Sequence, residues 1–120
     1  MSSVVVKSID DGRVRRAADA WARRLIRDRA EVEEIVFFGS FERDTFAPGS
    51  DLDVLVVLHD SDRPPRDRVP DYLPGAFPVG IDLLPYTRDE IRGSLSPGLL
   101  AEIRRSRWRH LRPGCASALG

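Results

Sequence analysis

Two aspartates stand at the start of the most apolar run in the chain. Asp51 and Asp53 flank a leucine, and residues 54–58, VLVVL, follow without a break. Such a run is typical of a strand, and a carboxylate among apolar neighbours costs free energy unless it is paired or bound to a metal. Side chains at positions i and i+2 of a strand point to the same face, with Cα atoms about 6.5 Å apart. Both carboxylates can therefore converge on one divalent cation.

A glycine–serine pair precedes this strand by ten residues. Gly39 and Ser40 follow the apolar run at 32–38, which we interpret as another strand. A Gly-Ser turn after a strand can bring backbone N–H groups close to phosphate oxygens. A phosphate-binding turn followed by a metal-binding carboxylate pair indicates phosphoryl or nucleotidyl transfer.

A third acidic residue interrupts a later apolar run. Asp82 lies within residues 79–86, VGIDLLPY, and would stand next to Asp53 if that strand pairs beside the strand at 51–58. Three close carboxylates raise one another's pKa values, and a bound cation removes this conflict. We therefore expect Mg²⁺ that arrives with the nucleotide rather than a permanent ion. Plainer alternatives stay open: a turn cap at Asp51, an arginine partner for Asp53 and an exposed structural aspartate at Asp82.

These residues resemble the motif of the minimal nucleotidyltransferase (MNT) family of the DNA polymerase beta superfamily. That motif places Gly-Ser at this spacing before Asp-x-Asp, which enters an apolar strand, and adds a third carboxylate on a later strand. It also carries an arginine three places after the serine, here Arg43, and then a glycine, where this chain has Asp44. The resemblance covers roughly residues 12–112.

The resemblance implies an enzyme, a nucleotidyltransferase that moves AMP from ATP to a hydroxyl acceptor with two Mg²⁺ ions. The implied catalytic and metal-binding residues are Asp51, Asp53 and Asp82. The implied nucleotide-binding residues are Gly39, Ser40 and Arg43. For Arg43, a surface salt bridge to Glu42 or Asp44 is the plainer alternative.

Small members of this family often occur beside a helical HEPN-type ribonuclease toxin. The resemblance thus implies the antitoxin of such a pair, which adenylylates its toxin. Because we see no second domain, the acceptor site would come from that partner or from a second copy of the chain. Two alternatives are a catalytically silent module that covers a helical partner and a small-molecule (antibiotic) nucleotidyltransferase. The arginine-rich stretch 104–112 adds an RNA-binding rival, although a formal net charge of zero argues against nucleic acid.

The length of 120 residues fits a single domain, residues 1–120, with 1–11 as a loose leader. No apolar run approaches a membrane span, and the N-terminus lacks the pattern of a signal peptide. The single Cys115 cannot form an internal disulfide, which fits a reducing cytoplasm. We therefore expect a cytoplasmic protein without membrane contact.

Hydrophobic periodicity predicts an α/β domain. Helices are expected over 13–29, shortly after 87–90 and over 97–105, and strands over 31–38, 51–58 and 79–86. The other expectations are a helical turn over 40–46, a loop over the Pro/Arg-rich residues 59–78, a helical turn or edge strand over 108–111 and a possible strand at Val4–Val6. We expect a small mixed β-sheet with helices packed on one face. The resemblance implies the palm-like nucleotidyltransferase fold, with the opposite face partly open for nucleotide.

Overall fold

The computed structural model describes residues 10–120, so the predicted strand at Val4–Val6 lies outside the described residues. The elements in chain order are α1 (Asp11–Asp28), β1 (Val32–Phe38), β2 (Leu52–Leu58), α2 (Pro65–Tyr72), β3 (Ile81–Thr87), α3 (Ile91–Ser94), α4 (Pro97–Arg105) and β4 (Arg109–Leu111). One sheet has the order β3-β2-β1-β4. Strand β1 is antiparallel to β2 and to β4, whereas β2 and β3 are parallel. The predicted α/β class with a mixed sheet is confirmed.

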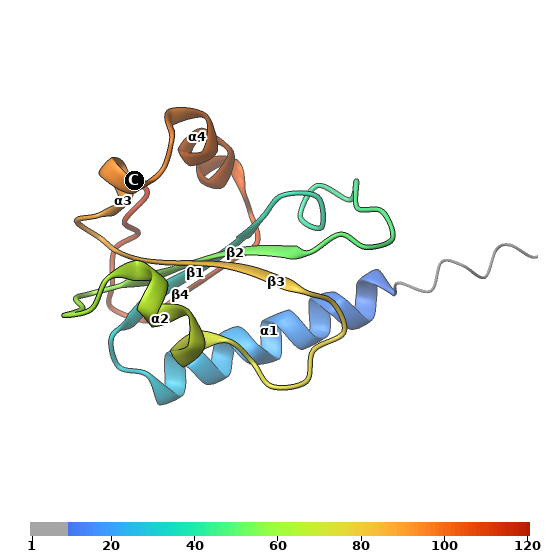
Figure 1. The fold of residues 1–120 in the computed structure, drawn as a ribbon, viewed down its shortest axis with the longest axis horizontal. Coiled ribbons are helices and arrows are strands. Elements are labelled where there is room, and N and C mark those ends of the chain that lie inside the picture. The colour runs from blue at the N-terminus through green and yellow to red at the C-terminus, as the bar shows by residue number, and fades with distance from the viewer. Residues whose placement is uncertain (1–9) are drawn as a thin grey trace, which may run out of the picture.

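Helix α1 packs along one face of the sheet (Figure 1). Asp10 caps it by accepting a hydrogen bond from the Arg13 amide at 3.2 Å. The buried stripe of α1 includes Trp21, whose ring lies 6.2 Å from that of Phe37 in β1. The Trp21 indole donates to the Tyr72 carbonyl at 3.0 Å, which ties α2 to the same face. Trp21 is therefore a core residue. Over residues 10–120, the helices are too short or too polar to span a membrane.

The prediction of a loop over 59–78 is wrong in its middle part, where α2 forms. Pro65 opens the helix, at a position where its missing N–H is not needed. Arg68 then fixes the helix, because its buried guanidinium pairs with both carboxylate oxygens of Glu90 at 2.6 and 3.0 Å. The inner side of α2 thus carries an arginine and a tyrosine instead of an apolar stripe. Periodicity could not reveal such a helix.

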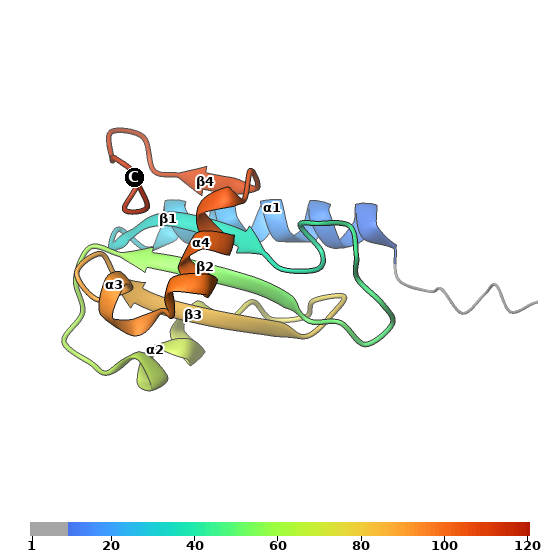
Figure 2. The same ribbon diagram turned by 90° about the horizontal axis from the view of Figure 1, so that it is seen from above.

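Helices cover both faces of the sheet, so the prediction that they pack on one face is wrong. Helices α3 and α4 lie across the sheet from α1 and α2 (Figures 1 and 2). Leu100 and Ile103 of α4 pack in a cluster with Val36 and Leu55. The physical reason is that β1 and β2 are apolar on both sides and need cover on both. Viewed from above, α4 leaves uncovered the end of this face where β1 ends and β2 and β3 begin (Figure 2).

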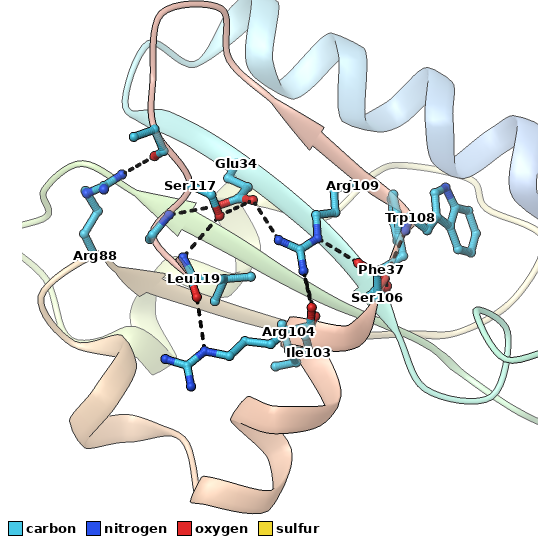
Figure 3. Close-up of polar contacts among 12 residues, drawn as sticks. Glu34, Phe37, Arg88, Ile103, Arg104, Ser106, Trp108, Arg109, Ser117 and Leu119 are labelled. Carbon is cyan, nitrogen blue, oxygen red and sulfur yellow. Dashed lines mark hydrogen bonds and ion pairs between the residues drawn. The ribbon is translucent and has the colours of Figure 1, made fainter.

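Residues 109–111 form an edge strand, one of the two alternatives predicted for them. Beyond this strand, residues 116–119, which we call the C-terminal strap, fold back beside α4 (Figure 3). Glu34 of β1 anchors the strap by accepting bonds from the Ser117 hydroxyl at 2.9 Å and the Ala118 amide at 3.2 Å. Its carboxylate also lies 3.7 Å from the Arg109 guanidinium. This buried acid is therefore well supplied with donors.

Candidate active site

The sheet register brings the predicted aspartates together. Asp53 of β2 is paired with Asp82 of β3 in the parallel ladder, so the two side chains are neighbours on one face. Alternation places Asp53 on the same side as Leu55, which faces α4. Asp51 precedes Asp53 by two residues and continues the same side. All three acids thus lie at the uncovered end of the α4 face.

Two glycines leave room for the carboxylates of this group. Gly39 has a φ of +83°, and a Cβ atom built on it would overlap Oδ2 of Asp53. A Cβ atom on Gly80 would overlap Oδ1 of Asp51. Gly80 also accepts a hydrogen bond from the Leu52 amide at 2.9 Å, which fastens the start of β3 beside β2. Sequence reasoning gave Gly39 a role toward phosphate only and missed Gly80, because neither close approach has a local signal.

Asp53 is the most perturbed acid of the site. Partial burial and, to a smaller extent, the negative charges of Asp82, Glu102 and Asp51 together raise the pKa of Asp53 to about 6. The positive charge of Arg43 lowers this pKa by a smaller amount. Throughout the described residues 10–120, no arginine lies within ion-pairing distance of any of the three aspartates. Within these residues, the structure therefore contradicts the alternative that Asp53 has an arginine partner.

The donor set fits magnesium in kind, because Mg²⁺ prefers carboxylate oxygens and keeps several waters. Within the described part of the chain, however, no three His, Cys, Asp or Glu side chains are close enough together to form a finished metal centre. The Asp53 and Asp51 side chains rest over Gly39 and Gly80 instead. Mutual repulsion of like charges accounts for carboxylates that share a face without closing on a common point.

The segment after Gly39 forms a hydrogen-bonded turn over residues 40–44, and its first bond has the spacing of the predicted helical turn. The Arg43 amide donates to the Gly39 carbonyl at 3.1 Å and the Thr45 amide to the Ser40 carbonyl at 2.8 Å. Asp44 has a φ of 62°, the left-handed region that favours glycine. Aspartate tolerates this region better than most residues. Asp44 can therefore adopt the left-handed conformation at the position where the MNT motif has glycine.

Arg43 forms an ion pair with Glu102 of α4, and not with Glu42 or Asp44 as the plainer alternative predicted. The Glu102 side chain is about a third exposed, and its charge contributes to the raised pKa of Asp53. Glu102 is thus a fourth acid of the site. Sequence reasoning missed it because it lies on a different element and belongs to no motif.

The arginines of residues 104–112 are used largely within the fold. Arg112 donates to the Val32 carbonyl at 2.8 Å, and Arg104 donates to the Leu119 carbonyl at 3.1 Å. Trp108 packs against Phe37 with ring centroids 4.4 Å apart. These contacts show that the stretch packs against the fold, which argues against an RNA-binding patch.

The aspartates lie on an open face and not in an enclosed cavity. Two surface hollows that share Leu73, Pro74 and Gly75 lie on the α1 side of the molecule, away from the three acids. These hollows contain no group of acidic or nucleophilic side chains suited to catalysis, so the three acids are the candidate site.

The chain is similar to known proteins in sequence and in fold. The family model described as a nucleotidyltransferase domain matches residues 20–103, a range that includes Gly39 through Glu102. A presumed nucleotidyltransferase from Sulfolobus solfataricus, known from a crystal structure at 1.40 Å resolution, matches with a TM-score of 0.55. The alignment covers 92% of this chain and 87% of that chain at 19% identity, so it shows the fold alone. A search of curated proteins finds no match.

Proposed function

This chain belongs to the nucleotidyltransferase domain family, and from that premise we propose that it is a Mg²⁺-dependent adenylyltransferase that uses ATP. In the proposed reaction, an acceptor hydroxyl oxygen attacks the α-phosphorus of ATP. The bond from that phosphorus to the bridging oxygen breaks, pyrophosphate leaves and the hydroxyl proton is released. The observation that carries the proposal is the pairing of Asp53 with Asp82 on adjacent strands, next to Asp51.

The three aspartates would divide the metal-binding work. Asp51 and Asp53 would hold both Mg²⁺ ions, and Asp82 would act on the side of the attacking hydroxyl. When bound, Mg²⁺ neutralises charge on the triphosphate and helps to deprotonate the hydroxyl. Burial is the largest cause of the raised pKa of Asp53, and the charges of Asp82, Glu102 and Asp51 add to it. This added repulsion supports the assignment, because a bound cation relieves it.

The turn after β1 would bind the triphosphate. The backbone N–H groups and the Ser40 hydroxyl would hold the β- and γ-phosphates, where the left-handed Gly39 lets the backbone approach closely. Arg43 would neutralise the terminal phosphate and exchange Glu102 for it. Catalysis would then consist mainly of positioning and charge neutralisation, as in phosphoryl transfer generally.

For the acceptor, we propose a tyrosine hydroxyl on a helical HEPN-type toxin whose gene lies beside the gene for this protein. This chain would then be the antitoxin, and both proteins would act in the cytoplasm. Residues 10–120 form one sheet with its covering helices and contain no added helical domain that could hold a small acceptor. The uncovered end of the α4 face would receive the partner's hydroxyl (Figure 2). A small-molecule acceptor such as an antibiotic has no comparable support.

A two-stage experiment tests these assignments. Isothermal titration with ATP should show binding that depends on Mg²⁺, and no such binding would favour a silent protein-binding module. The protein is then incubated with labelled ATP and the product of the neighbouring reading frame, and both chains are weighed. We expect one or more AMP groups on the partner. The Asp53→Asn variant should give none, whereas Asp89→Asn, a change at an exposed aspartate outside the site, should behave like the parent.

A further inference from the structure

We infer that Arg15 of α1 is a positioning residue for the nucleotide-binding turn, which we define as residues 39–45. The Arg15 side chain donates from Nη2 to the Phe41 carbonyl at 2.6 Å, with a longer contact to the Glu42 carbonyl at 3.5 Å. The inference deepens the proposed function, because it assigns to α1 a role in presenting the groups that bind triphosphate. Neither the sequence motif nor the family match singles out this residue.

The Arg15 guanidinium is itself held on several sides. Its Nε atom donates to both carboxylate oxygens of Asp11 at 3.2 Å, and the group lies over the Trp108 ring, 4.4 Å from the centroid. Trp108 is fixed in turn by its hydrogen bond to Asp19 at 2.8 Å and by its packing against Phe37. A planar fork that stacks and donates in two directions is a task that lysine cannot reproduce. The contact to the turn therefore comes from a prearranged group.

A charge argument adds to the contact argument. Asp44, in the same turn, carries a negative charge where the turn would bind a triphosphate, and like charges oppose binding. The Arg15 guanidinium lies 3.8 Å from the Asp44 carboxylate and offsets that charge. Arg15 thus holds the turn through its hydrogen bond to the Phe41 carbonyl and also offsets the negative charge of Asp44 in that turn.

Binding measurements on charge-matched variants test the inference. For Arg15→Gln we expect the Kd of Mg·ATP to rise about three- to tenfold. Adding Asp44→Asn should recover about half of that loss on a logarithmic scale, because asparagine tolerates the left-handed φ without the charge. Arg13→Gln, a change at an exposed arginine of the same helix, should leave the Kd unchanged. An unchanged Kd in Arg15→Gln, or an Asp44→Asn effect equal in both backgrounds, would overturn the inference.

Amide hydrogen exchange without nucleotide separates this inference from the proposed function. In Arg15→Gln, the amides of Arg43 and Thr45 should exchange faster, because their turn hydrogen bonds lose support, whereas Arg13→Gln should not change them. If no variant binds Mg·ATP yet these amides respond, the proposed function fails and the positioning of the turn stands. If the parent binds Mg·ATP and Arg15→Gln alters neither exchange nor affinity, the inference fails alone.

Discussion

Two carboxylates on the same face of the sheet have opposite surroundings. Glu34, near the start of β1, is 1% exposed and accepts hydrogen bonds from Ser117 and Ala118 (Figure 3). Asp53, at the start of β2, is half-buried, and this burial together with the charges of Asp82 and other nearby acids raises its pKa to about 6. Burial alone does not determine the role of an acid. A carboxylate surrounded by donors stabilises the fold, whereas one surrounded by other carboxylates is suited to a cation.

The largest expected effect concerns Asp53, the carboxylate that is surrounded by other acids. Asp53→Asn should lower AMP transfer by at least about 100-fold, because a group that acts on the reacting charge is lost. Its melting temperature in metal-free buffer should stay the same or rise slightly, since like-charge repulsion is relieved. Initial rates and thermal melts with chelator measure both quantities. A marked loss of thermal stability would place Asp53 with Glu34 as a structural acid.

The next largest effect concerns Glu34, the carboxylate that is surrounded by hydrogen-bond donors. Glu34→Gln should lower the free energy of unfolding by about 1–3 kcal/mol, because the strap loses charge-assisted hydrogen bonds and Arg109 loses its counter-charge. Transfer per folded molecule should not change. Urea denaturation gives the first quantity, and rates normalised to folded protein give the second. Ser117→Ala removes one donor to Glu34 and the acceptor of the Leu119 amide but leaves the carboxylate in place, so it should cost less. An equal or larger cost would contradict the view that Glu34 is the anchor.

A pH series sharpens the contrast further. The pKa of Asp53 is raised in the folded protein from 3.8 to about 6, so its ionisation destabilises the folded state. The favourable contribution is complete below about pH 4 and is lost as the pH rises through about 6. The parent should therefore lose thermal stability relative to Asp53→Asn over that interval in metal-free buffer. Melts of both proteins across the range check the sign, and a constant difference would contradict the proposed crowding.

The smallest effect concerns the acid that holds Arg43. Glu102→Gln should tighten Mg·ATP binding about two- to fivefold, because Arg43 becomes available to phosphate and one negative charge disappears. Titration calorimetry measures the change, with Asp62→Asn, at an exposed aspartate in the loop before α2, as the matched control. Weaker binding in Glu102→Gln would instead assign Glu102 to metal or nucleotide binding.

Elements with a clear apolar period could be predicted from the sequence. The predicted helix over 13–29 is α1, and the predicted strands over 31–38, 51–58 and 79–86 are β1, β2 and β3, each within two residues at either end. The short helix after 87–90 and the helix over 97–105 are also confirmed as α3 and α4. In each case the signal lies within the segment itself, so no distant contact is needed to find it.

Features that depend on distant contacts could not be predicted. Helix α2 depends on the Arg68–Glu90 pair, and the apolar stripe of α4 does not reveal which face of the sheet it covers. At the site, the motif located Asp51 and Asp53, but the proximity of Glu102 and the need for Gly80 follow only from packing. The residues that change the pKa of Asp53 or leave room for Asp51 are therefore known only from the tertiary structure.

The parallel pairing of β2 with β3 has a consequence for the growing polypeptide. Strands β1 and β2 are adjacent antiparallel segments, but β3 can join them only after the intervening stretch that includes α2 has been made. A nascent chain that has paired only its early strands therefore holds Asp51 and Asp53 without Asp82. By the proposed assignment, the metal-binding group would be complete only after β3 has paired with β2.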